Sequence, residues 1–73
     1  MLIRFKFKYN GFVRILNTEN IFHMCEVSSE IGFDSMVKDA VVKFSSQEQA
    51  IEALDKIYTA YANGARAITI EVD

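Results

Sequence analysis

Only one segment of this chain has the spacing of an amphipathic helix, and this limits the folds open to it. The segment lies between Ser45 and Gly64. Ser45 and Ser46 each stand three residues before a Glu or Gln, the capping-box pattern, and Asn63-Gly64 suits a helix C-terminus. Its apolar residues form one stripe: Ala50, Ala53, Leu54, Ile57, Tyr58 and Tyr61. One helix covers one face of a sheet, so the strands expected elsewhere must leave sheet surface uncovered by it.

The N-terminal segment predicts a strand with two different faces. Residues 3–8 alternate between large apolar and basic side chains, and a period of two is typical of a strand with one buried face. The apolar face carries Ile3, Phe5 and Phe7, and the opposite face carries Arg4, Lys6 and Lys8. The Asn10-Gly11 pair that follows predicts a hairpin.

The length of the hairpin loop decides which residues of the second strand face inward. A two-residue turn would mix apolar and basic residues on each face. A three-residue loop, residues 9–11, pairs Phe7 with Val13 and Phe5 with Ile15, at the cost of one like-charge pair on the other face. We therefore predict the three-residue loop, with Val13 and Ile15 directed inward.

The rest of the chain predicts a single α+β domain, residues 1–73. The expected segments are a turn at 17–20, a strand at 21–28, a loop around Gly32 at 29–35, and strands at 36–44 and 67–72. Either face of residues 21–28 could be buried. The predicted order is β-β-β-β-α-β, a mostly antiparallel sheet of about five strands with one helix packed on one face.

The sheet face without a helix is the candidate functional surface. Exposed apolar residues grouped on a sheet indicate an interface. The expected interaction face and its hairpin tip carry Arg4, Lys6, Lys8, Tyr9, Phe12, Arg14 and Leu16. A domain of 73 residues has little core, and such domains commonly gain stability by oligomerising. We therefore expect a non-enzymatic protein that acts through protein–protein interaction, as a homodimer or with a host protein.

Nucleic-acid binding through the basic hairpin is the alternative. Residues 1–18 carry four bases and no acid, a charge of +4, whereas residues 19–73 carry four bases and ten acids, a charge of −6. Such asymmetry suits a polyanion or head-to-tail contact between two copies. The period of two, however, directs Phe5 and Phe7 away from the basic face, and base stacking needs aromatic and basic groups on one surface.

The sequence predicts no metal, cofactor or catalytic centre. Cys25 is the only cysteine and His23 the only histidine, too few for a four-ligand zinc site. A cysteine nucleophile needs a base and an orienting group, a set that the sequence does not supply. Without an apolar run of ~20 residues or a signal-peptide pattern, we expect no membrane span and a cytoplasmic location.

Two family resemblances rest on the segment around the helix. "AVVKFSSQEQAIEALDKI" and "NGARAITIEV", within residues 40–72, resemble the second half of an RNA-recognition motif. The stacking aromatics of that family correspond here to Asp39 and Val41, and a hairpin replaces its first helix, so we interpret the likeness as shared strand–helix–strand physics rather than kinship. "LNTENI" followed by "VKFSSQEQAIEALDKIY" resembles small, uncharacterised β-rich proteins of phages and mobile elements in Gram-positive bacteria, which implies binding to a host protein.

Overall fold

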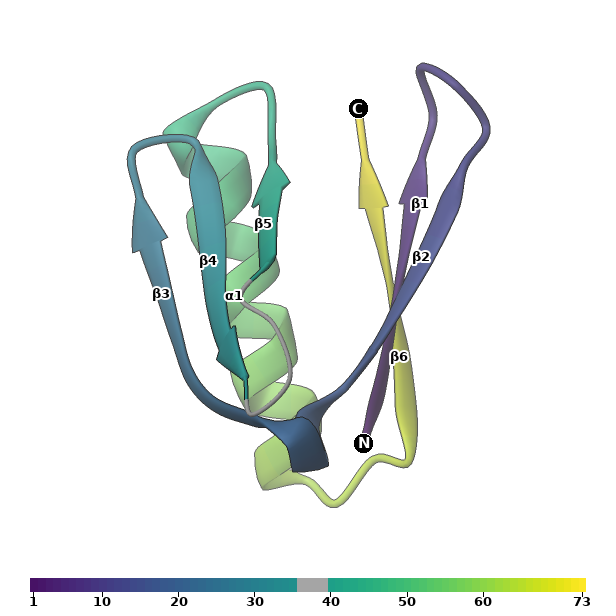
Figure 1. The fold of residues 1–73 in the computed structure, drawn as a ribbon, viewed down its shortest axis with the longest axis vertical. Helices are drawn as coiled ribbons and strands as arrows, with labels where there is room; N and C mark the ends of the chain where they lie inside the picture. The colour runs from purple at the N-terminus through teal and green to yellow at the C-terminus, as the bar shows by residue number, and fades with distance from the viewer. Residues whose placement is uncertain (36–39) are drawn as a thin grey trace.

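In a computed structural model of the chain, the described residues form two three-stranded sheets and one long helix (Figure 1). The structure describes residues 1–35 and 40–73, and the side chains of all these except positions 20, 22, 23, 25–27, 34 and 35. Along the chain the elements are β1 (Leu2–Phe7), β2 (Val13–Asn17), the 3-10 helix η1 (Thr18–Asn20), β3 (Ile21–Val27), β4 (Glu30–Ser35), β5 (Ala40–Lys43), α1 (Gln47–Ala62) and β6 (Ala67–Val72). The expected α+β class is confirmed.

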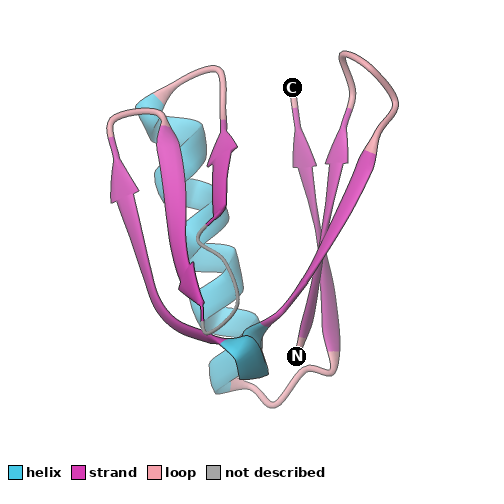
Figure 2. Cartoon of the chain, viewed as in Figure 1, coloured by secondary structure: helices cyan, strands magenta, loops and turns pink. Residues whose placement is uncertain are grey.

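The strands do not form the single, mostly antiparallel sheet that the sequence predicts. The first sheet has the order β2-β1-β6, with β1 antiparallel to β2 and parallel to β6. The second sheet, β3-β4-β5, is antiparallel throughout. The first sheet is mixed because α1 carries the chain back to the end at which β1 begins, so β6 runs alongside β1 in the same direction (Figure 2).

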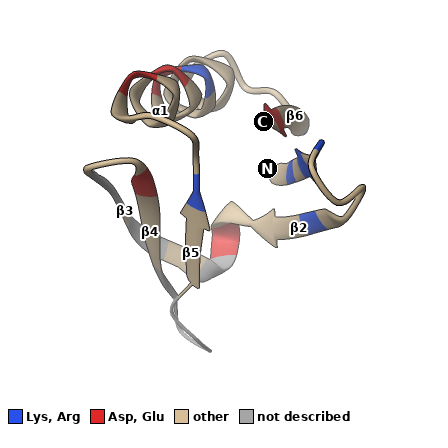
Figure 3. Ribbon diagram, turned by 90° about the horizontal axis from the view of Figure 1, so that it is seen from above, with Lys and Arg blue, Asp and Glu red and all other residues tan. Residues whose placement is uncertain are grey.

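The core lies where the inner faces of both sheets meet α1. Phe5 of β1 and Phe33 of β4 pack edge to face, with ring centroids 5.8 Å apart. Seen from above, α1 and the two sheets surround this common interior (Figure 3). The buried apolar residues come from all three: Ile3, Phe5, Ile31, Phe33, Val42, Phe44, Ala50, Ala53, Ile57, Ile70 and Val72.

The prediction of a loop at residues 29–35 is wrong, because residues 30–35 form strand β4. Ile31 and Phe33 alternate with Gly32 and are fully or almost fully buried, a period-two pattern that Gly32 conceals. Gly32 pairs with Val41 of β5. The turn lies earlier, at Ser28, whose φ of 57° is in the left-handed region.

Of the other predicted segments, some are observed and some fall outside the described residues. The predicted last strand is confirmed as β6. The predicted turn at 17–20 is confirmed as η1, which Asn17 caps by accepting a hydrogen bond from the Glu19 N–H. The strand predicted at 36–44 is seen as β5, whereas residues 36–39 lie outside the described residues. The side chains of His23 and Cys25 also lie outside them.

The helix begins and ends where the sequence predicts. The Ser46 side chain accepts a hydrogen bond from the Gln49 N–H, 3.2 Å away, and so satisfies a free donor of the first turn. Asn63 is the C-cap, and Gly64 takes a φ of 76°. Tyr58 and Tyr61, which belong to the predicted apolar stripe of the helix, are 74% and 64% exposed.

The prediction of a three-residue hairpin loop is also wrong. Phe7 donates its N–H to the Phe12 carbonyl, so the loop has four residues, 8–11, with Gly11 at a φ of 74°. In the observed register Arg14 lies opposite Phe5, and Val13 lies opposite Lys6. A shift of one residue moves every side chain of a strand to the other face. Val13 therefore faces outward rather than inward.

Loss of the helix cap should destabilise the fold. We expect Ser46→Ala to lower the free energy of unfolding by about 1 kcal/mol, because the Gln49 N–H loses its acceptor. Ser46→Asp, which keeps an acceptor at this position, should stay within about 0.5 kcal/mol of the original chain. Urea unfolding followed by circular dichroism measures both, and equal losses in the two variants would contradict the capping role.

Phe33 and Phe12 should respond very differently to truncation. Phe33→Ala removes a side chain that is 1% exposed and should cost about 3–5 kcal/mol, or abolish folding. Phe12→Ala removes the same atoms from a side chain that is 70% exposed and should change stability by about 0.5 kcal/mol or less. Thermal and urea unfolding of the pair compare them, and similar losses would contradict the assignment of the core.

Candidate interaction surface

The first sheet has an outer face that points away from the core. Ile3 and Phe5 are buried on the inner face of β1, so the residues between them point outward. The strand registers extend this outer face to β2 and β6. It consists of Leu2, Arg4, Lys6, Val13, Ile15, Asn17, Ala67, Thr69 and Glu71.

Aliphatic side chains are exposed along one side of this outer face. Leu2 is 47% exposed, Val13 52% and Ile15 59%. Val13 and Ile15 are successive outward-facing residues of β2, which is an edge strand of the first sheet. Leu2 lies on the neighbouring strand β1. We name Leu2, Val13 and Ile15 the aliphatic strip. Clustered apolar exposure of this kind is typical of a contact surface rather than of a solvated sheet face.

The basic residues of β1 separate the aliphatic strip from the acidic end of β6. Arg4 donates from Nε and Nη2 to Thr69 Oγ1, at 3.1 and 3.0 Å. Lys6 is exposed between Val13 and Glu71 in the register. Lys8 Nζ lies 3.4 Å from Glu71 Oε2 and 3.5 Å from Asp73 Oδ1. Acidic groups thus stand beside the bases, and the surface is amphipathic rather than uniformly basic.

The seven residues predicted for the interaction face do not lie together. Arg4 and Lys6 lie on the outer face, and Lys8 follows them at the end of β1. Tyr9, 71% exposed, lies in the hairpin loop, with its ring edge-on to that of Phe7.

The second strand of the hairpin departs further from the prediction. Phe12 is 70% exposed just before β2. Arg14 and Leu16 occupy the inner face, opposite Phe5 and Ile3, and Leu16 packs against the core. The Arg14 Nη1 donates to the carbonyl oxygen of Val41 on β5, 3.2 Å away.

Sequence reasoning missed Val13 and Ile15 because either register of β2 leaves apolar residues on both faces. Phe12 and Leu16 fall on one face and Val13 and Ile15 on the other. Counting apolar residues therefore cannot select the register. The Asn10 side chain is the local signal that could have helped, since its Oδ1 accepts from the Phe12 N–H and closes the longer loop.

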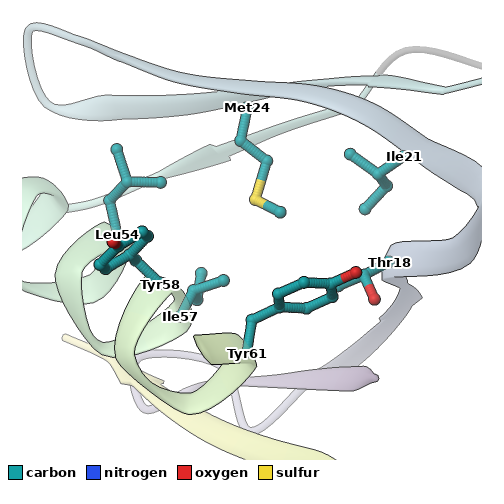
Figure 4. Close-up of a pocket in the computed structure, with 7 residues that line it drawn as sticks. All are labelled: Thr18, Ile21, Met24, Leu54, Ile57, Tyr58 and Tyr61. Carbon is teal, nitrogen blue, oxygen red and sulfur yellow. The ribbon is translucent and has the colours of Figure 1, made fainter. Parts of the chain in front are cut away.

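A hollow of about 390 Å³ lies between α1 and β3 (Figure 4). Its lining is apolar except for three hydroxyl groups, and consists of Thr18, Ile21, Met24, Leu54, Ile57, Tyr58 and Tyr61. The Thr18 hydroxyl already accepts a hydrogen bond from the N-terminal ammonium, at 3.0 Å. The hollow therefore offers apolar contact area rather than a set of convergent charged groups.

Within the described part of the chain, no group of three or more His, Cys, Asp or Glu residues is placed to hold a metal ion. The same residues include no helix that is long and apolar enough to cross a membrane. The chain matches no protein-family model, no curated protein sequence and no solved structure.

The ion pairs of Lys8 should make stability depend on pH at alkaline values. Glu71, and to a smaller extent Asp73, raise the pKa of Lys8 above its ordinary value of 10.5. The stabilisation that these ion pairs give the fold is therefore fully present below pH 10.5 and is lost as the pH rises through the raised pKa of Lys8. NMR titration of the Lys8 side chain should give a lower pKa in Glu71→Gln than in the original chain.

Glu48→Gln is the matched control, because Glu48 lies in the first turn of α1 rather than beside Lys8. It should leave the pKa of Lys8 where it is. Because both side chains of the Lys8–Glu71 pair are more than half exposed, added salt should reduce the effect of Glu71→Gln. A Lys8 pKa that is the same in both variants would contradict the pairing.

Proposed function

We propose that this chain is a non-enzymatic protein-binding domain whose contact surface is the aliphatic strip with Arg4 and Lys6. The observation that carries the proposal is the exposure of Leu2, Val13 and Ile15 together on a sheet face that points away from the core. Apolar side chains gain free energy when a partner removes them from water, at about 25 cal/mol per Å². The neighbouring bases supply charge that orients a partner.

Protein binding is better supported than nucleic-acid binding. A phosphate backbone favours several bases on one surface, and its binding strength follows their number. Here Lys8 is paired with Glu71 and Asp73. Arg14 reaches across to β5 on the other face of the sheet. The outer face is left with two bases beside an aliphatic strip, which suits a partner that is itself partly apolar.

Polar substitution in the aliphatic strip tests the proposal. The purified chain, immobilised and exposed to lysate of its source cell, should retain a partner that Ile15→Ser loses by tenfold or more. Loss of one well-packed anchor commonly costs about 2 kcal/mol or more of binding free energy, which corresponds to such a change. Mass spectrometry of the eluates measures the ratio.

Ile51→Ser is the matched control. Ile51 is an aliphatic residue of α1 that is 42% exposed, and it lies outside the first sheet. This variant should retain the partner at the original level. Equal retention by Ile15→Ser and the original chain, with both variants folded, would show that the aliphatic strip is not the contact surface.

A further inference from the structure

The free edge of β2 exposes backbone groups next to the aliphatic strip. Phe7 donates to the Phe12 carbonyl, and Thr18 donates to the Met1 carbonyl. These two bonds mark hydrogen-bonded pairs at both ends of the β1–β2 ladder, and such pairs alternate along an antiparallel ladder. The intervening bonded positions on β2 are therefore Arg14 and Leu16.

Val13 and Ile15 consequently direct their N–H and C=O groups away from β1. β2 is the last strand of the first sheet, so these four groups lie along its outer edge, where no backbone hydrogen bond joins them to another described residue. Figure 3 shows β2 on the outer side of the first sheet, beyond β1 and β6. An edge strand with unpaired backbone groups is a template for a further strand, and native proteins commonly protect such edges.

The side chains of β2 do not protect this edge. Val13 and Ile15, which carry the outward backbone groups, are also the most exposed members of the aliphatic strip. Arg14, between them, projects from the opposite face. In a strand that paired here, the residues opposite Val13 and Ile15 would share their outer face, and apolar residues would suit those positions. The residue opposite Arg14 would lie on the inner face and would need to suit a guanidinium group.

The charge of Arg14 identifies the chemistry of that strand. Its guanidinium uses Nη1 to contact the Val41 carbonyl and keeps further N–H donors for a carboxylate. An acidic residue directly opposite Arg14 would be attracted. In the antiparallel register that pairs Val13 with Ile15 of a second copy, two Arg14 side chains would instead stand opposite each other, which is unfavourable.

From this geometry we propose that β2 binds an extended segment of another protein by β-strand addition, and that this segment carries an acidic residue between two apolar residues. The proposal rests on the proposed function and specifies how the partner binds. Backbone hydrogen bonds to Val13 and Ile15 supply affinity, and the side chains beside Val13, Arg14 and Ile15 supply specificity.

A synthetic peptide tests this mode of binding directly. Acetyl-Val-Glu-Val-Glu-Val-Glu-Val-amide is titrated to about 1 mM, a range in which NMR registers weak complexes. Amide hydrogen exchange should slow at Val13 and Ile15, and stay unchanged at Arg14 and Leu16, whose N–H groups already face β1. The matched peptide with lysine in place of glutamate should bind more weakly, and the Arg14→Glu variant should reverse this preference.

Ile15→Pro and Ile15→Ala separate backbone pairing from side-chain contact. Both variants lose the isoleucine side chain, but only proline removes the outward N–H, a change that edge strands tolerate. Ile15→Pro should bind the glutamate peptide at least about fivefold more weakly than Ile15→Ala. If the proline variant does not fold, amide protection in the original chain decides the question.

Three results would overturn the proposal. One is the absence of peptide binding or of protection at Val13 and Ile15. Another is equal binding by the proline and alanine variants. The third is protection of the same amides without peptide, growing with protein concentration, which would identify a second copy as the occupant. If Ile15→Ser still loses its lysate partner in any of these cases, the aliphatic strip binds by its side chains alone and the proposed function stands.

Discussion

The edge-to-face contact between Phe5 and Phe33 is the interaction on which the rest of the structure depends. It joins the first sheet to the second, and residues from both sheets and from α1 close around it. Each three-stranded sheet has one apolar face that another layer must cover, and a chain of this size buries little other apolar surface. Because the two sheets share one interior with α1, each uses its inner face for packing and leaves its other face outside.

This sharing explains why the candidate surface lies on the first sheet. Ile3, Phe5 and Ile70 turn one face of that sheet to the core, and the alternation of strand residues sends the remaining side chains outward. On β1 and β6 the outward residues are largely polar, as expected for a solvated face. On β2 they include Val13 and Ile15, so apolar side chains coincide at one edge with backbone groups that bond to no other described strand.

Several elements could be predicted because their determinants are local. The serine cap, apolar spacing and Asn63-Gly64 end define α1, and alternation defines the inward residues of β1 and β6. Strand β4 escaped prediction because Gly32 looks like a turn residue when its strand partners are unknown. The hairpin register escaped because Asn10-Gly11 suits more than one loop length, and one residue of difference exchanges the faces of β2.

The sequence by itself determined the α+β class, the helix and its ends, and the inward face of β1. It did so because helix caps and side-chain periodicity act over a few residues. Only the tertiary structure decided that the strands form two sheets, that β1 pairs in parallel with β6, and that Val13 and Ile15 rather than Arg14 and Leu16 face outward. Those choices depend on contacts between residues far apart in the chain, such as Leu16 against the core, and local patterns do not encode them.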